Sequence, residues 1–585
     1  MLQGTRAQAG ALSNGSSMTA ASLGDSGEPV ANPRVRMALW FVGVFLALLQ
    51  ASGNHNFMNA DGISYLDMSD GVVTGEWTRL INGTWSPLYP ALLGVAARLL
   101  KPSAYWQFTL VHAVNVMCFV FAFACFEFLL RSIIPGRDRP GQDGYSQMPA
   151  WVCLTLGYTV FLWASLRLLT LTKPTPDMLM SGFLYLSMGL VMRIKRGQDG
   201  FWIHAALGLV LGLGYLAKTA MLPLGILMLA TTLFFGGGLR KTVPRVLVAF
   251  CVMLLIGGPY MVALSTLKHR PTFGDSATVT HLEDLDKAGP SIYWQNPGGA
   301  AGNFLHPPRK IFDNPPAYEF ARPLAVTQPL WYDPSYWVEG VQPRFHLRSQ
   351  FAAVRRNLDV YAQLFSRTGG LVVGFLILCF MVGAKRSLSA LTCFWPLWAL
   401  ATAALGMYMA IHVEERYIGA FLTLLWLGLF CGFRIPDERP GKLLAGMVVG
   451  IVLTLAVPVV PVANQTNPDI SPEQWRATDN RSFEIAAALQ QLGIRPHDRV
   501  ARISPFAVDG WARLAKVTIV AEVQMTAADD FWCSTPEVQD ALLRTFAAAG
   551  AKAVVAPVRR VPLPKGWTKL GDTGFAVHLL YISAG

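Results

Sequence analysis

The amino-acid sequence predicts an α-helical polytopic membrane protein with a small α/β domain at its C-terminal end. Three observations carry this prediction. Only 14% of the 585 residues are charged, whereas soluble domains carry about 25%. Hydrophobic residues make up 53% of the chain, and its mean hydropathy is +0.38. Apolar windows of about 17 to 25 residues recur, each long enough to cross a hydrocarbon core of roughly 30 Å.

We predict about eleven transmembrane helices on this criterion. Residues 1–33, in contrast, are rich in Gly, Ser and Ala and lack apolar clusters, which predicts a disordered cytoplasmic tail. The predicted spans lie near 37–53, 108–130, 149–170, 177–193, 201–217, 220–238, 245–266, 370–384, 389–411, 417–433 and 442–462.

The distribution of Lys and Arg predicts the orientation. The net charge of +12 is spread over short clusters between apolar windows, which argues against a nucleic-acid partner. Alternate connections are strongly basic, and by the positive-inside rule they are cytoplasmic. The other short connections hold only Lys173, Lys218 and Arg416. The basic set is Arg34, Arg36, Arg131, Arg137, Arg139, Arg193, Lys195, Arg196, Arg240, Lys241, Arg245, Lys385, Arg386, Arg434, Arg439 and Lys442.

This orientation places the protein in the cell inner (cytoplasmic) membrane, with its N-terminus cytoplasmic and three segments outside. The first, 54–106, contains a short apolar helix that begins near Pro87 and suits the membrane interface. The second, 267–369, is rich in aromatic residues, which fits either a packed cap over the bundle or a Trp/Tyr interfacial belt.

The third outward segment, 464–585, alternates helix and strand patterns and predicts the extracytoplasmic α/β domain. It contains no glycine-rich phosphate-binding motif, so no chemistry is assigned to it. Helices are expected at 482–492 and 537–549, and strands at 499–503, 517–523, 553–557 and 576–582. Seven of the eight cysteines fall in apolar runs without metal-ligand spacing, so neither a disulfide framework nor a zinc site is predicted.

The stretch from Asn59 to Ser69 is the first candidate for function. Asp61 and Tyr65 are four residues apart and would share one face of a helix. A carboxylate at a membrane boundary is typical of a ligand or a general base. It is equally typical of a helix cap that satisfies free backbone amides. The residues alone leave both interpretations open.

Further ionisable residues occur at the predicted outer ends of helices: Asp177, Lys218, Glu415 and Arg416. Considered singly, a Lys or Arg at such a position most often extends its charged group to the membrane–water interface. Taken together, these groups would ring one cavity in which basic residues hold a phosphate and a carboxylate activates an acceptor.

Five motifs in order resemble a known group of enzymes. Asp61-x-x-x-Tyr65-x-x-x-Ser69 and Trp85-Ser-Pro87-Leu-Tyr-Pro90 resemble the start of glycosyltransferase family 39. Its relatives include the protein O-mannosyltransferases and the lipid A aminoarabinose transferases, all of the GT-C superfamily. The resemblance covers about residues 37 to 435 and continues in Thr175-Pro-Asp177-Met-Leu, in Gly212-Leu-Gly-Tyr-Leu-Ala-Lys218 and in Glu415-Arg416-Tyr417-Ile.

The resemblance implies a GT-C-like fold and inverting transfer of a sugar from a polyprenyl-phosphate donor at the outer membrane face. It implies that Asp61 is the general base and that Lys218 and Arg416 hold the leaving phosphate of the lipid. Asp177 would order a neighbouring loop or contact the acceptor. The further substrate-binding candidates are Tyr65, Glu415 and Tyr417. The acceptor, whether lipid, glycan or protein, stays open.

Two features depart from the family pattern or lie outside it. Gly62 follows Asp61, where many members have a second acid, so a bound divalent metal is possible but not supported, and no cofactor is predicted. Arg309 and Lys310 follow His306 within the aromatic segment. This basic pair would bind a phosphate or accompany sugar stacking, or it is part of a structural cap.

Two functions from other classes remain as alternatives. A transporter or flippase for a lipid-linked intermediate would carry polar residues deep within several spans and would show inverted repeats. The chain has no convincing internal repeat, and its ionisable residues cluster at helix ends. A non-catalytic envelope-assembly protein with the same fold is the second alternative, because a fold does not establish turnover.

Overall fold

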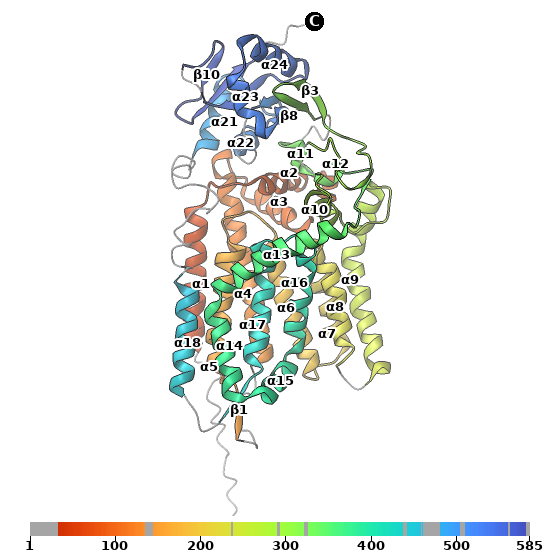
Figure 1. The fold of residues 1–585 in the computed structure, drawn as a ribbon, viewed down its shortest axis with the longest axis vertical. Helices are drawn as coiled ribbons and strands as arrows, with labels where there is room; N and C mark the ends of the chain where they lie inside the picture. The colour runs from red at the N-terminus through yellow and green to blue at the C-terminus, as the bar shows by residue number, and fades with distance from the viewer. Residues whose placement is uncertain are drawn as a thin grey trace, which may run out of the picture.

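A computed structural model of the chain describes residues 33–134, 144–235, 238–288, 293–320, 326–436, 441–457, 459, 480–503, 509–559 and 562–580. The predicted tail therefore lies outside the described residues, apart from Pro33. The remaining chain forms a long helix bundle with a mixed sheet at one end, which we call the sheet end (Figure 1).

A helix lies in every one of the predicted apolar windows. Within the described residues, five helices are long and apolar enough to cross a membrane singly, and two bent helix pairs raise that number to seven. The chain is therefore a multi-pass membrane protein, whereas the number of spans stays a prediction. The bundle helices are α1 (Pro33–Gly53), α4 (Gln107–Ile133), α5 (Ala150–Trp163), α6 (Asp177–Lys195), α7 (Phe201–Ala217), α8 (Met221–Thr232), α9 (Leu239–Leu267), α14 (Gly369–Val382), α15 (Ala384–Cys393), α16 (Trp395–Met409), α17 (Glu415–Cys431) and α18 (Gly441–Ala456).

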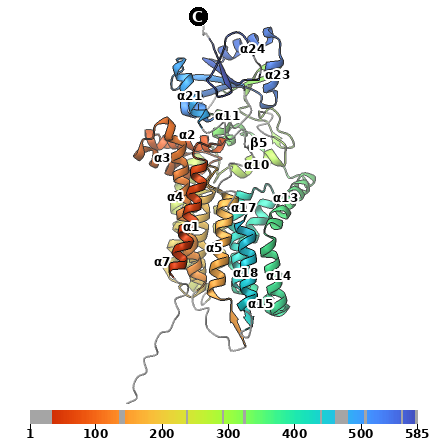
Figure 2. The same cartoon turned by 90° about the vertical axis from the view of Figure 1, so that its left-hand side faces the viewer.

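A layer of short helices lies between the bundle and the sheet (Figures 1 and 2). The short apolar helix predicted after Pro87 is present as α3. The layer consists of α2 (Ala60–Thr74), η1 (Trp77–Leu80), α3 (Leu88–Leu100), η2 (Ala104–Trp106), α10 (Ser276–Asp284), α11 (Pro329–Tyr332) and α12 (Pro334–Trp337). The longer helix α13 (Leu347–Arg367) crosses the bundle helices at the sheet end (Figure 1).

The aromatic segment forms a packed cap within this layer. Tyr293 and Trp294 are fully buried, and Phe320 and Trp337 expose 2% or less of their surface. Rings at a membrane interface would keep an edge in contact with headgroups, so this burial favours the cap over the interfacial belt.

Seven strands of the described chain form one sheet in the order β10-β11-β9-β7-β8-β4-β3. The central strand β7 runs parallel to β8 and β9, and every other pair is antiparallel. The strands are β3 (Arg309–Asp313), β4 (Pro316–Glu319), β7 (Arg499–Arg502), β8 (Thr518–Val523), β9 (Ala553–Pro557), β10 (Trp567–Lys569) and β11 (Phe575–Leu579).

Most C-terminal elements match the sequence expectations. Strands β7, β8, β9 and β11 lie at the four predicted positions, and α21 (Arg481–Gln491) and α24 (Pro536–Ala548) lie at the two predicted helices. The sheet also takes β3 and β4 from the 267–369 segment. Its elements therefore come from two stretches of chain that bundle helices separate. The remaining elements are the short strands β1 (Tyr145–Gln147), β2 (Ala301–Gly302), β5 (Val341–Gln342) and β6 (Arg434–Pro436) and the helices α22 (Gly510–Ala515), η5 (Met525–Ala527) and α23 (Ala528–Cys533).

Candidate functional site

Four helix ends meet beneath the aromatic cap, and each carries an ionisable residue that the sequence singled out. Asp61 is the second residue of α2 and Asp177 the first of α6. Lys218 caps the C-terminus of α7, and Arg416 is the second residue of α17. The helix dipoles favour carboxylates at N-termini and a cation at a C-terminus, so three of these four positions suit their charges.

The Asp61 carboxylate lies between two donors. Its Oδ1 atom accepts a hydrogen bond from Trp331 Nε1 at 3.0 Å, and its Oδ2 atom lies 3.3 Å from Arg416 Nη1. Only 12% of the Asp61 side chain is exposed. An ionised carboxylate offers about four lone-pair positions. These two contacts therefore fix its orientation and leave further positions for a proton donor.

Asp177 connects the two cations of the site. Its Oδ1 atom forms an ion pair with Lys218, and its Oδ2 atom lies 3.8 Å from Arg416 Nη1. Asp177 is almost completely buried, so its charge needs these partners. Arg416 thus lies close to both Asp61 and Asp177, and Lys218 binds the other oxygen of Asp177.

Aromatic rings line the same cluster. The ammonium of Lys218 lies 4.0 Å from the centre of the Tyr417 ring. The quadrupole of the aromatic ring attracts a cation over its face and stabilises it there. Tyr417 OH also lies 3.3 Å from Arg416 Nη2. Tyr65 is buried between the rings of Trp85 and Tyr89. Burial and the nearby Asp61 charge raise the pKa of the Tyr65 hydroxyl well above its ordinary value, which keeps it neutral.

The structure shows that Asn59, and not Asp61, caps the N-terminus of α2. Asn59 is the N-cap of α2, and its side chain accepts a hydrogen bond from the Gly62 backbone N–H at 2.9 Å. Asn is among the preferred residues for this position. Because Asn59 caps the helix, the Asp61 carboxylate is directed to Trp331 and Arg416 instead.

Gly62 permits a close approach between α2 and the loop before α6. A Cβ atom at this position would lie 2.3 Å from Met58 Sδ and 3.0 Å from Pro174 Cβ. A second acid after Asp61 therefore has no room here. The glycine brings the start of α2 against the loop that leads to Asp177, which places Asp61 near Asp177.

A π-helical turn, η3 (Ala164–Leu169), ends α5 and shapes that loop. Such turns leave backbone groups without their regular helical partners. Gln50 of α1 compensates, because its amide donates to the Leu166 carbonyl and accepts from the Leu171 N–H, each at 2.9 Å. His112 also bridges the carbonyls of Leu171 and Phe57, so the chain segments before α6 and α2 are held together.

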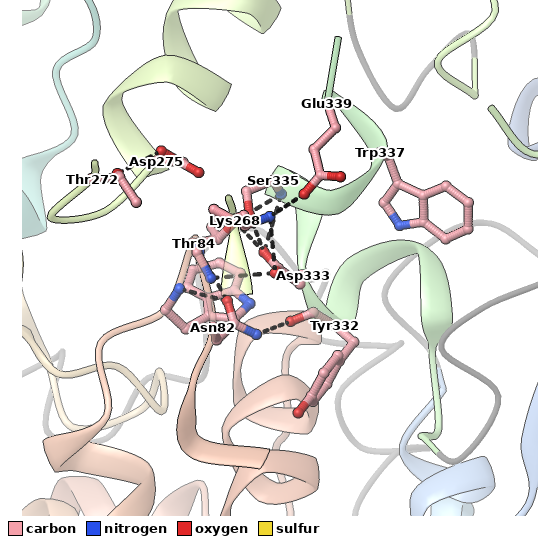
Figure 3. Close-up of polar contacts among 12 residues, drawn as sticks. Asn82, Thr84, Lys268, Thr272, Asp275, Tyr332, Asp333, Ser335, Trp337 and Glu339 are labelled. Carbon is pink, nitrogen blue, oxygen red and sulfur yellow. Dashed lines mark hydrogen bonds and ion pairs between the residues drawn. The ribbon is translucent and has the colours of Figure 1, made fainter. Parts of the chain in front are cut away.

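A second cluster of polar contacts surrounds Asp333 (Figure 3). Asp333 accepts hydrogen bonds from the hydroxyls of Thr84, at 3.0 Å, and Ser335, at 2.6 Å. Lys268 lies 3.7 Å from Asp333 and 2.8 Å from Glu339. Asn82 donates to the Tyr332 carbonyl at 2.8 Å. This polar cluster joins the loop before α3 to α11, the helix that carries Trp331.

Three of the predicted site residues face elsewhere. Glu415 pairs with Arg367 of α13 rather than with the Asp61 cluster. Arg309 pairs with Glu319, and Lys310 lies 2.9 Å from Asp313, both within the edge hairpin of the sheet. The structure therefore brings together Asp61, Tyr65, Asp177, Lys218, Arg416 and Tyr417.

Two residues of the cluster were absent from the sequence-based site. Trp331 was assigned to the aromatic segment without a role at Asp61. Glu414 forms an ion pair with Arg416. The sequence has two adjacent acids, Glu414 and Glu415, and does not indicate which of them faces the cluster. Burial opposes ionisation of Glu414, but the hydrogen bond from His412 and the Arg416 charge prevail and hold its pKa well below the usual range.

No family model and no curated protein sequence matches this chain. The crystal structure of the aminoarabinose transferase ArnT from Cupriavidus metallidurans bound to undecaprenyl phosphate is similar over 94% of this chain and 98% of that chain, with 10% identity and a TM-score of 0.44. The Archaeoglobus fulgidus oligosaccharyltransferase tethered to an acceptor peptide with the NVT sequon is similar over 89% of this chain and 69% of that chain, with 11% identity and a TM-score of 0.48. Both are glycosyltransferases of GT-C fold, the group that the sequence resembles.

Proposed function

We propose that this protein is a glycosyltransferase that moves a sugar from a polyprenyl-phosphate donor to an acceptor at the sheet end of the bundle. The observation that carries the proposal is the position of Arg416 close to both Asp61 and Asp177, with Lys218 beside them. A base and two cations therefore lie within one cluster at the helix ends.

The chemistry assigned to the cluster is an inverting displacement. Asp61 takes the proton of an acceptor hydroxyl while that oxygen attacks the anomeric carbon from the face opposite the phosphate. The bond between the anomeric carbon and the phosphate oxygen breaks, and its electron pair stays with the leaving polyprenyl phosphate. Lys218 and Arg416 stabilise the negative charge that builds on that oxygen.

The contacts of Arg416 agree with the roles assigned to Asp61 and to the two cations. Arg416 is shared among Asp61, Asp177 and Glu414, so a donor phosphate would compete with these carboxylates for the guanidinium. When Arg416 turns to the phosphate, Asp61 keeps its contact with Trp331 and gains a free oxygen for the acceptor proton. Donor binding would in this way prepare the base.

The charge distribution supports an assignment of the sheet end to the outer face of the cytoplasmic membrane. Basic residues accompany the other end, where α6 ends at Lys195 and α9 begins near Arg240 and Lys241. Positive charge of this kind marks cytoplasmic connections. Polyprenyl-phosphate sugar donors would then reach the cluster from the outer leaflet.

The test is the loss of transfer in Asp61→Asn. The variant keeps the shape of the side chain but cannot accept a proton, and a general base contributes about 10²- to 10⁴-fold to a rate. Mass spectrometry of envelope glycans and glycolipids, with and without the protein, first identifies the product. Asp572→Asn, at an exposed turn where Asp572 pairs with Lys569, is the matched control.

The outcomes separate the candidate functions. We expect Asp61→Asn to lose the product while it still binds undecaprenyl phosphate, and Asp572→Asn to keep both. Full product formation by well-expressed Asp61→Asn and Asp61→Ala would contradict the mechanism. An envelope profile that does not change when the protein is removed would contradict the enzymatic function itself.

A further inference from the structure

Helix α13 lies across the bundle helices at the sheet end (Figure 1). It meets α14, which runs along the bundle, at an angle of 74° after a single-residue break. A helix at such an angle to a spanning neighbour runs nearer to the plane of the membrane than to its normal. Helix α13 contacts the chain between α16 and α17, next to Arg416.

One face of α13 packs on the protein. Ala353, Asn357, Tyr361 and Leu364 are buried and recur at the spacing of one helical face. Asn357 donates to the Met409 carbonyl at 2.9 Å, and Tyr361 OH donates to the Leu405 carbonyl at 2.8 Å. These contacts attach α13 to the end of α16.

The exposed face has two parallel stripes. Leu347, Phe351 and Leu358 expose 60%, 67% and 50% of their surfaces and form an apolar stripe. Arg348 and Arg355 are exposed and seven residues apart, so they lie on one line two turns apart. At about 100° per residue, this basic stripe lies roughly 60° further round the helix than the apolar one.

The two arginines of the basic stripe differ from the others on the helix. Arg356 lies 3.6 Å from Asp284, and Arg367 pairs with Glu415. Arg348 and Arg355 form no ion pair with any residue that the structure describes. Phe345, two residues before the helix, is 71% exposed. The outward face thus presents two guanidinium groups without an ion pair in the described chain beside large apolar side chains, and the exposed Asp359 carboxylate lies one turn after Arg355.

This combination is that of a helix lying in a membrane interface, with its apolar stripe among acyl chains and its basic stripe among anionic headgroups. We propose that α13 binds anionic phospholipids of the surrounding bilayer through Arg348 and Arg355. The charge of the stripe selects an anionic lipid, and the depth of the neighbouring apolar stripe selects a lipid of the bilayer rather than a soluble phosphate.

Lipid binding at α13 would act on the candidate site through the loop between α16 and α17. Asn357 also donates to the Ile411 carbonyl at 3.2 Å, and Arg367 pairs with Glu415, directly before Arg416. A helix held at headgroup level therefore sets the height of Arg416 relative to the membrane surface. This inference stands on α13 alone and does not require the proposed transfer reaction.

Native mass spectrometry of the full chain in detergent, titrated with phosphatidylglycerol, tests the proposal. We expect Arg348→Gln/Arg355→Gln to bind phosphatidylglycerol roughly 25-fold more weakly, about fivefold for each arginine. The control Arg495→Gln/Arg544→Gln removes the same charge from exposed positions of the C-terminal region and should leave binding unchanged. Phosphatidylcholine should bind the wild type and the α13 variant equally.

Two results would overturn the proposal. One is equal retention of phosphatidylglycerol by the α13 variant and the wild type. The other is an α13 variant that keeps phosphatidylglycerol but loses undecaprenyl phosphate, because the basic stripe would then belong to a polyprenyl-phosphate site. Loss of phosphatidylglycerol binding alone, with undecaprenyl phosphate binding intact, supports it.

Discussion

The indole nitrogen of Trp331 lies 3.0 Å from Asp61 Oδ1, across 270 positions of the sequence. The carboxylate that we propose as a general base is therefore oriented by the aromatic cap as well as by its own helix. Arg416 fixes the other oxygen, so loss of the indole N–H would leave the carboxylate attached on one side only.

We expect Trp331→Phe to reduce transfer about tenfold, because the loss of a hydrogen bond to a charged group costs about 1.5 kcal/mol or more. The aromatic ring and its packing are largely kept, so the affinity for undecaprenyl phosphate should stay close to that of the wild type. The measurement is the rate of product formation at saturating donor.

Trp337→Phe is the matched control, since Trp337 Nε1 donates to the Pro329 carbonyl at 3.2 Å and no contact with Asp61 accompanies it. In ¹⁵N-tryptophan-labelled protein, the indole signal missing from Trp331→Phe should shift in Asp61→Asn. A signal that stays in place in Asp61→Asn would show that the hydrogen bond is not formed in solution.

Arg416→Lys should weaken binding of undecaprenyl phosphate about tenfold. Lysine keeps the charge but loses the planar fork with which Arg416 reaches Asp61 and Glu414 together. The comparison is Arg434→Lys, at an exposed position where Arg434 donates to the Tyr145 carbonyl. Equal affinities for the Arg416 and Arg434 variants would remove Arg416 from the donor site.

Thermal stability should fall with rising pH in two steps, owing to neighbours of the cluster. Burial raises the pKa of Glu283 to about 7, and the hydrogen bond to Asp284 raises the pKa of His412 to about 9. Both values lie above those of the unfolded chain, about 4.3 and 6.5. The Glu283 contribution is therefore present at acidic pH and lost as pH rises through 7, and that of His412 is lost as pH rises through 9.

The two steps can be separated by melting curves of the detergent-solubilised protein between pH 4 and pH 10. Glu283→Gln should flatten the lower step, and His412→Gln the upper one. If His412→Gln keeps the whole decline between pH 7 and pH 9, His412 is not the titrating group.

Gly62→Ala should destabilise the protein, because the new methyl group would overlap Met58 and Pro174. Overpacking of this kind typically costs about 1–3 kcal/mol. Gly450→Ala in α18 is the control, since its Cβ would meet open space and alanine favours a helix. A Gly62 variant that melts at or above the Gly450 variant would contradict the close approach of α2 to the loop before α6.

Arg513 connects the C-terminal region to the helix of Asp61. It lies 2.9 Å from Asp67 and 2.6 Å from Asp70, both on α2. Arg513→Ala leaves a buried carboxylate unpaired and should cost on the order of 3–5 kcal/mol. In a double-mutant cycle with Arg513→Gln and Asp67→Asn, the double variant should be more stable than the sum of the single effects. Additive effects would exclude this coupling.

Much of the fold follows from local sequence patterns. The helices α4, α6 and α9 are visible as apolar windows, and β8 as a run of β-branched residues, because each pattern repeats within its own segment. The helix-end charges were predictable for the same reason, since each marks the point where an apolar window stops. A shared position at the ends of neighbouring helices then brings them together.

The contacts that arise between distant segments were not predictable in this way. β3 and β4 are short, and their partner β8 lies far along the chain, so no local period marks them. Which of Glu414 and Glu415 faces Arg416 depends on the residue at which α17 begins, and a one-residue change turns the side chain by about 100°. Trp331 lies in a segment with many aromatic residues, and the sequence does not distinguish the ring that contacts Asp61 from the others.

The shared sheet has a consequence for biosynthesis. The hairpin β3–β4 is made before α13 to α18, and its partner β8 follows roughly two hundred residues later. The edge of β4 that pairs with β8 therefore stays unpaired while the intervening helices enter the membrane. An unpaired strand edge invites wrong pairing with other chains. A chain released before residue 518 would thus expose the unpaired edge of β4 outside the bilayer. Pairing of β8 with β4 completes the sheet and covers this edge.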